Sequence, residues 1–130
     1  MLASLGNYLA YFGTTLGLLI LAVFVYVGIL PYDEIALVRR GNVAAAVALA
    51  GTLIGYAVVV YSATIHGVSL LETAMWSAIS LVVQIVAFEI VNFSVSDFKA
   101  GMEKGELSYG VVLGAFSIAV GIINAGCITP

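Results

Sequence analysis

Charged side chains are scarce in this sequence. Only 8% of its 130 residues are Asp, Glu, Lys or Arg, whereas hydrophobic residues make up 63%. A water-soluble domain draws about a quarter of its residues from the charged types, so this chain has too little polar surface to cover a core in water. We therefore expect an integral membrane protein whose first partner is the lipid bilayer.

Cysteine and histidine occur once each, as Cys127 and His66. One cysteine cannot close a disulfide within the chain, and a Cys/His metal cluster needs more ligands than this pair offers. The net charge is only −3 and forms no basic or acidic patch, which gives no support to nucleic-acid binding. The sequence also lacks a nucleophile with a base, a phosphate-binding glycine loop and two carboxylates in one span. We expect no enzyme activity, no metal and no cofactor.

What the sequence has instead is four long apolar runs. They cover residues 9–30, 42–65, 73–95 and 107–129, with short polar connections between them. Each run is long enough to cross a hydrocarbon core of about 30 Å at about 1.5 Å per residue. The first run lacks the positive start and the cleavage site of a secretory signal, so we expect a retained span. The sequence predicts an all-α membrane protein in which residues 1–130 form a single domain of four transmembrane helices.

The two halves of the chain align when the sequence is shifted by 64 residues. The shift places Asp33 on Asp97, Gly41 on Gly105 and Ile54 on Ile118. Because each half would contribute a hairpin that starts on the same side of the membrane, the halves would be parallel repeats about an axis along the membrane normal. We therefore predict two tandem helical hairpins, residues 9–65 and 73–129.

The basic residues predict the orientation in the membrane. Arg39 and Arg40 lie in the first connection, and Lys99 and Lys104 lie in the third. An even number of spans separates these connections, so they share one side, and the positive-inside rule assigns that side to the cytoplasm. We expect both termini on the outer face.

Glycines recur four residues apart in three of the predicted spans. The pairs are Gly13 with Gly17, Gly51 with Gly55 and Gly110 with Gly114, and Gly121 continues the last of them. Small residues at this spacing let two helices approach closely in lipid, so helix packing and self-association into a homo-oligomer are the favoured interpretation. The alternative is that a glycine face lines a narrow path through the bundle.

The second span and the end of the fourth span show a family resemblance. The patterns are Asn42-x-Ala44-Ala45-Ala46 followed by Gly51-Thr52-Leu53-x-Gly55-Tyr56, then Gln84, then Gly121-Ile122-x-Asn124-Ala125-x-Cys127-x-Thr129. In these the chain resembles the YjfL-like bacterial inner-membrane proteins, domain of unknown function family 350. The resemblance covers nearly the whole chain and implies a four-span protein of the bacterial inner membrane, without an established activity. Glu106 stands where the pattern leads us to expect a second asparagine.

Four polar side chains within the predicted spans form a candidate intramembrane site, namely Gln84, Glu89, Ser117 and Asn124. Gln84 lies at the middle of its span, where an amide that bonds to another helix contributes about 0.6 to 2 kcal/mol. Bonding between helices is the favoured interpretation over ion selectivity. Glu89 lies about 9 Å inside the end of its span. It either pairs with Arg39 or Arg40, or faces a water-filled vestibule and binds a cation or a proton.

Two classes of function follow from these features. The first is a homo-oligomeric bundle that passes or senses a small ion or proton. The alternative is a structural or accessory subunit that packs with other membrane proteins and transports nothing. Ionisable groups inside a span favour the first class, and the glycine faces favour association in both.

Overall fold

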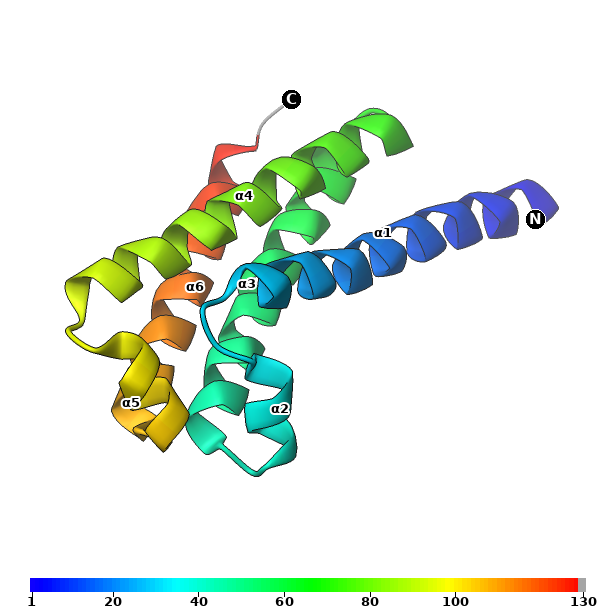
Figure 1. Ribbon diagram of the computed structural model, residues 1–130. Helices are drawn as coiled ribbons and strands as arrows, with labels where there is room; N and C mark the ends of the chain where they lie inside the picture. Colours follow the sequence, from blue (N-terminus) through cyan, green and yellow to red (C-terminus); the bar gives the residue numbers. More distant parts are fainter. Residues whose placement is uncertain (129–130) are drawn as a thin grey trace.

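The computed structural model describes residues 1–128. They fold into four long helices and two short ones, joined by short connections (Figure 1). They are α1 Leu2–Ile29, α2 Glu34–Arg39, α3 Val43–His66, α4 Leu70–Ser94, α5 Phe98–Lys104 and α6 Leu107–Cys127. The four long helices, α1, α3, α4 and α6, are each long and apolar enough to cross a membrane. The prediction of an all-α protein with four spans is confirmed.

Some helix ends differ from the predicted ones. α1 begins at Leu2 rather than at residue 9, because residues 2–8 hold no charge or proline that would end the helix. α4 begins at Leu70 rather than at residue 73, because the Ser69 hydroxyl caps it by accepting a hydrogen bond from Glu72 N at 3.2 Å. The predicted end of the fourth span at Thr129 lies outside the described residues.

The two polar connections with the basic residues each contain a short helix, α2 or α5, which the sequence analysis did not predict. Asp33 caps α2, and its Oδ1 accepts a hydrogen bond from Ala36 N at 3.1 Å. Both short helices are followed by a glycine in the left-handed region, with φ of +83° at Gly41 and +80° at Gly105. α2 and α5 lie at the same end of the bundle (Figure 1). We call it the basic end, because it holds Arg39, Arg40, Lys99 and Lys104.

α3 and α6 form the centre of the bundle and run side by side in the same direction from the basic end (Figure 1). The residues in closest contact are Ala44 with Gly110, Gly51 with Gly114, and Gly55 with Gly121. A Cβ atom added to any of these glycines would overlap the backbone that faces it. All the glycines that we predicted to pack in the second and fourth spans therefore lie in one interface.

α4 packs against α3 and α6 along its length, whereas α1 meets the bundle only toward its C-terminal end. The buried residues of α1 are Ala22 and Tyr26, and its N-terminal half projects away from the other helices (Figure 1). Gly13 and Gly17 have no atom within 4 Å of the position of an added Cβ. Within one copy of residues 1–128, these two glycines therefore make no helix contact.

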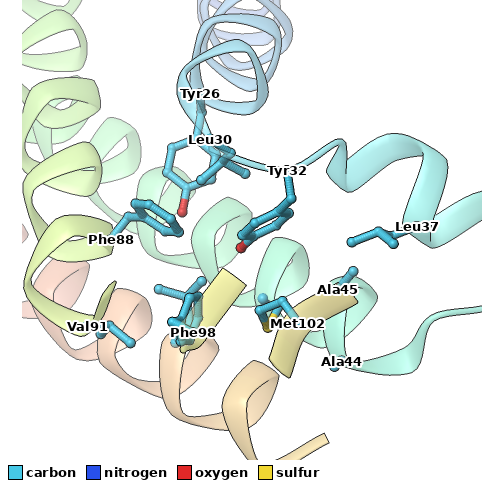
Figure 2. Close-up of a cluster of buried hydrophobic side chains, with 12 residues drawn as sticks. Tyr26, Leu30, Tyr32, Leu37, Ala44, Ala45, Phe88, Val91, Phe98 and Met102 are labelled. Atoms are coloured by element: carbon cyan, nitrogen blue, oxygen red, sulfur yellow. The ribbon is translucent and has the colours of Figure 1, made fainter. Parts of the chain in front are cut away.

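The largest hydrophobic cluster lies near the basic end and is centred on Phe88 of α4 (Figure 2). The Phe88 ring contacts Tyr26, Tyr32 and Phe98 edge to face, with centroid distances of 6.3, 6.2 and 5.9 Å. The short helices contribute Leu37, Phe98 and Met102 to the same cluster. α2 and α5 are therefore packed onto the bundle and are not solvated loops.

Asn42 joins the start of α3 to the end of α5. Its Oδ1 accepts a hydrogen bond from Ala45 N at 3.0 Å, and its Nδ2 donates to Met102 O at 2.7 Å. Glu106, which precedes α6, makes no side-chain cap bond. The departure from asparagine at residue 106 thus leaves α6 without the cap that α3 has.

Helices in the two halves begin at positions that are 64 residues apart. α2 and α5 begin at Glu34 and Phe98, and α3 and α6 begin at Val43 and Leu107. The packing of the halves differs, because α4 lies along α3 whereas α1 makes no comparable contact with α6.

Gly51→Ala is expected to lower the melting temperature of the protein in detergent. The added methyl group overlaps the Gly114 backbone, and overpacking of this kind costs about 1 to 3 kcal/mol. Gly13→Ala is the matched control, because its methyl group enters open space and leaves the melting temperature unchanged or slightly higher. Equal melting temperatures for the two variants would contradict the close contact of α3 with α6.

Candidate intramembrane polar site

Gln84 lies where α3, α4 and α6 meet, and only 2% of its surface is exposed. Its Nε2 donates hydrogen bonds to Thr52 O at 3.1 Å and to Ser117 O at 3.4 Å. Its Oε1 is also buried and has no hydrogen-bond partner in residues 1–128. The amide therefore connects three helices through its donor end and leaves its acceptor end unfilled.

Two opposing contributions of the Gln84 amide to stability nearly cancel. Hydrogen bonds between membrane helices contribute about 0.6 to 2 kcal/mol. An acceptor buried without a partner costs about 1 to 3 kcal/mol. Bonding between helices therefore does not by itself account for an amide at this position. A group that donates a hydrogen bond to Oε1 would remove the cost.

Three hydroxyl groups form a row beside Gln84. Thr52 Oγ1 lies 3.5 Å from Ser117 Oγ and 3.4 Å from the Tyr26 hydroxyl. Thr52 has a single hydroxyl proton, and its shortest contact is with Ala48 O at 3.1 Å. Tyr26, Ser117 and Ala48 each offer an oxygen to that proton, so Thr52 donates to one of the three at a time. We call Tyr26, Thr52 and Ser117 the hydroxyl row, which connects α1, α3 and α6.

A cavity of about 10 Å³ lies against the hydroxyl row. Residues of α1, α3 and α4 line it, Tyr26, Thr52 and Gln84 among them, and the atoms that face the cavity are apolar. This volume is close to the space that one water molecule requires, but a cavity with apolar walls offers water no hydrogen bond, and the volume is far too small for a hydrated ion.

Glu89 is not part of the hydroxyl row, although it is close enough for its charge to act on Tyr26. It is half-buried on α4, next to Phe88 and toward the basic end. Arg40 Nε donates to Ala36 O of its own helix at 3.4 Å, and Arg39 is exposed. The ion pair between Glu89 and an arginine therefore stays a prediction.

Asn124 lies on the same side of α6 as Ser117, two helical turns further from the basic end. Its Nδ2 is buried and has no hydrogen-bond partner in the described residues. The carbonyl of the next residue, Ala125, accepts a hydrogen bond from Ser62 Oγ at 2.7 Å. Ser62 Oγ also lies 3.2 Å from His66 Nδ1. A second group of polar atoms thus lies toward the end of the bundle opposite to the basic end.

Glu34 is a buried acidic residue that the sequence analysis missed. Only 1% of its surface is exposed, and neither carboxyl oxygen has a hydrogen-bond partner in residues 1–128. Burial raises the pKa of Glu34 from 4.5 to about 8. The Tyr32 hydroxyl is likewise buried without a partner, and burial raises its pKa as well.

The sequence contained a signal for Glu34 but little signal for the hydroxyl row. In a helix that begins after Asp33, Glu34 shares one face with Leu37 and Val38, which is the apolar face. Thr52 follows Gly51 in a run of small residues. For Tyr26 no sequence pattern distinguishes an inward side chain from one that faces lipid.

Metal ligands do not gather in this structure. Among residues 1–128, no set of three or more His, Cys, Asp or Glu side chains is arranged to hold a metal ion.

The fold and these side chains define a polytopic α-helical membrane protein with polar groups buried at the centre of its bundle. Residues 1–128 match the model of a family described as Domain of Unknown Function (DUF350). The chain is also 33% identical over 129 residues to the UPF0719 inner membrane protein YjfL of Escherichia coli (strain K12), in a match that covers 99% of this chain and 98% of that protein.

The YjfL protein of Escherichia coli O157:H7 matches with the same identity and coverage. The chain therefore belongs to the DUF350 family, which confirms the resemblance drawn from the sequence motifs. No solved structure matches the chain.

Proposed function

We propose that the protein is a non-enzymatic, homo-oligomeric helical bundle of the bacterial inner membrane that passes or senses protons. The observation that supports this most directly is the unfilled Oε1 of Gln84 beside the hydroxyl row. Hydroxyl groups and water both donate and accept hydrogen bonds, so they can transfer a proton with small movements. The small volume of the cavity against this row favours a proton over a hydrated ion as the transferred species.

Polar groups on both sides extend the hydroxyl row toward the membrane surfaces. On the side of the basic end, Tyr26 lies within electrostatic range of Glu34. On the opposite side, Asn124 and Ser62 lead toward His66. Buried polar and ionisable groups that follow one another through a helix bundle are typical of proton relays in membranes.

Gln84→Met tests this proposal. The variant keeps the length of the side chain and removes the amide, so its stability should stay within about 1 kcal/mol of the wild type, because the lost bonds and the removed orphan acceptor offset each other. In liposomes with a pH-sensitive dye inside, the wild type should dissipate an imposed pH gradient. Gln84→Met should do so about tenfold more slowly, which corresponds to a barrier higher by about 1.4 kcal/mol.

Val86→Met is the control for the flux assay, because Val86 is an exposed residue of the same helix. It should conduct like the wild type. Absence of flux from folded wild-type protein, or equal flux from Gln84→Met, would contradict proton passage through the hydroxyl row.

The alternative function is a structural or accessory subunit, and the open face of α1 favours it. Gly13 and Gly17 have no neighbour in one copy of the described residues, although small residues at this spacing typically pack against a helix. Folded protein that self-associates or binds another membrane protein but shows no flux would support this alternative.

We expect Gly13→Leu to weaken self-association without disturbing the fold. The added side chain enters open space within one copy, but it would hold a second helix away from this face. Energy transfer between copies labelled at Cys127 in liposomes measures the association. Gly13→Ala should associate like the wild type because alanine keeps the face small. Unchanged association in Gly13→Leu would exclude this face as the contact.

We infer that the basic end faces the cytoplasm and that both termini lie on the periplasmic side. The four basic residues support this, because positive charge accumulates in cytoplasmic connections. We also infer two tandem hairpin repeats, residues 9–65 and 73–129. The helix starts that are 64 residues apart and the positive φ of both Gly41 and Gly105 support this inference.

Thiol labelling tests the orientation. Cys127 is exposed, and a membrane-impermeant maleimide should label it in cells whose outer membrane has been opened. In a Cys127→Ser background, Glu103→Cys places the thiol at the basic end and should be labelled only after the inner membrane is disrupted. The reverse pattern would reverse the orientation.

A further inference from the structure

Glu34 is the first residue of α2, and its carboxyl group points into protein rather than into water. Its exposed fraction is 1%, and neither Oε1 nor Oε2 has a hydrogen-bond donor in residues 1–128. An ionised carboxylate that is removed from water without a donor or a positive partner is strongly unfavourable. The neutral acid loses far less on burial, so this position favours a bound proton.

Two phenols lie near Glu34. Tyr26 of α1 and Tyr32, which precedes α2, are close enough to feel its charge. Tyr32 belongs to the hydrophobic cluster shown in Figure 2, whose members from α3, α4 and α5 are apolar. They include Ala44, Ala45, Phe88, Val91, Phe98 and Met102.

The charged groups nearby do not stabilise an anion at Glu34. Asp33, which precedes α2, uses its carboxylate to cap that helix, and Glu89 of α4 acts on Tyr26. Arg39 of α2 and Lys99 of α5 are exposed. Burial is the single cause that raises the pKa of Glu34 to about 8. Divalent cations need about six or more oxygen ligands, which two phenols and one carboxyl group do not provide.

We propose that Glu34 is a proton-binding site that holds α2 against the bundle when it is protonated and releases α2 toward water when it ionises. In the binding step a proton from water adds to one carboxylate oxygen and gives the neutral acid. This inference goes beyond the proposed proton passage, because it concerns an equilibrium at the basic end and holds whether or not the protein conducts.

The direction of the pH dependence follows from the two states of α2. When α2 is docked, the pKa of Glu34 is about 8, and when α2 is released the carboxyl group returns toward its ordinary value of 4.5. The docked state therefore binds more protons and is favoured at low pH. Docking weakens as the pH rises from 4.5, by about tenfold per pH unit, and the effect levels off above about pH 8.

Infrared spectroscopy of the full chain in liposomes tests the protonation. At pH 7 the wild type should show the carbonyl stretch of a protonated carboxylic acid, and this band should disappear with a midpoint near the pKa of about 8. Glu34→Gln, which has the shape of the neutral acid, should lack the band, and Glu89→Gln should keep it. No acid band at pH 7 in the wild type, or a band lost in Glu89→Gln instead, would overturn the assignment.

Thiol labelling tests the movement of α2. In a Cys127→Ser background, Leu37→Cys places a thiol on the buried face of α2, and Arg39→Cys places one on its exposed face. The ratio of the two labelling rates cancels the intrinsic pH dependence of the thiol. Between pH 6 and pH 8 this ratio should rise by up to about 100-fold. With Glu34→Gln added, it should stay low and constant.

Two outcomes of the labelling experiment would overturn the proposal. A ratio that stays constant with Glu34 present would show that ionisation leaves α2 docked. An equal rise with Glu34→Gln would show that another group drives the movement. Because Leu37→Cys is present in both backgrounds, any weakening of the packing by that substitution cancels in the comparison.

Discussion

The close approach of the α3 and α6 backbones is the contact on which the rest of this bundle depends. Helices in lipid gain little from the hydrophobic effect, so their association relies on dispersion at short range and on the absence of bulky side chains. Gly51, Gly114 and the neighbouring glycines have no side chain that would hold the two backbones apart. The same contact positions the polar groups, because Thr52 follows Gly51 and Ser117 lies one turn after Gly114. The hydroxyl row is therefore a product of glycine packing.

Much of the fold could be predicted from the sequence, because apolar runs of sufficient length have few alternatives to spanning a membrane. The glycine pattern also predicted residues of the central interface, but it did not separate Gly51 and Gly55 from Gly13 and Gly17. Both pairs have the same spacing, and only the first pair meets a helix in one copy of the described residues. Spacing shows that a helix can be approached, whereas the partner depends on how each helix is rotated and tilted.

Part of the candidate site could be predicted and part could not. Counting residues placed Gln84 at the middle of its span, and the structure gives it partners on two other helices. Tyr26 could not be assigned to the site, since its direction depends on the rotation of α1. Glu34 was missed because its segment was assigned to a polar connection, and the apolar face that it shares with Leu37 and Val38 becomes visible only once a helix is assigned after Asp33. A buried carboxylate on a short helix is therefore difficult to recognise from sequence.

The parallel contact of α3 with α6 has a consequence for how the protein is made. The residues that meet in it, such as Gly51 and Gly114, are separated in the sequence by all of α4 and α5. During synthesis α3 is made before α6 exists, so the glycine face that α6 covers in the finished bundle is still open at that stage. α1, α3 and α4 are therefore made before α6 is available to pack against α3. α6 completes the core only after α4 and α5 have been made, so the central contact of this bundle forms late in its synthesis.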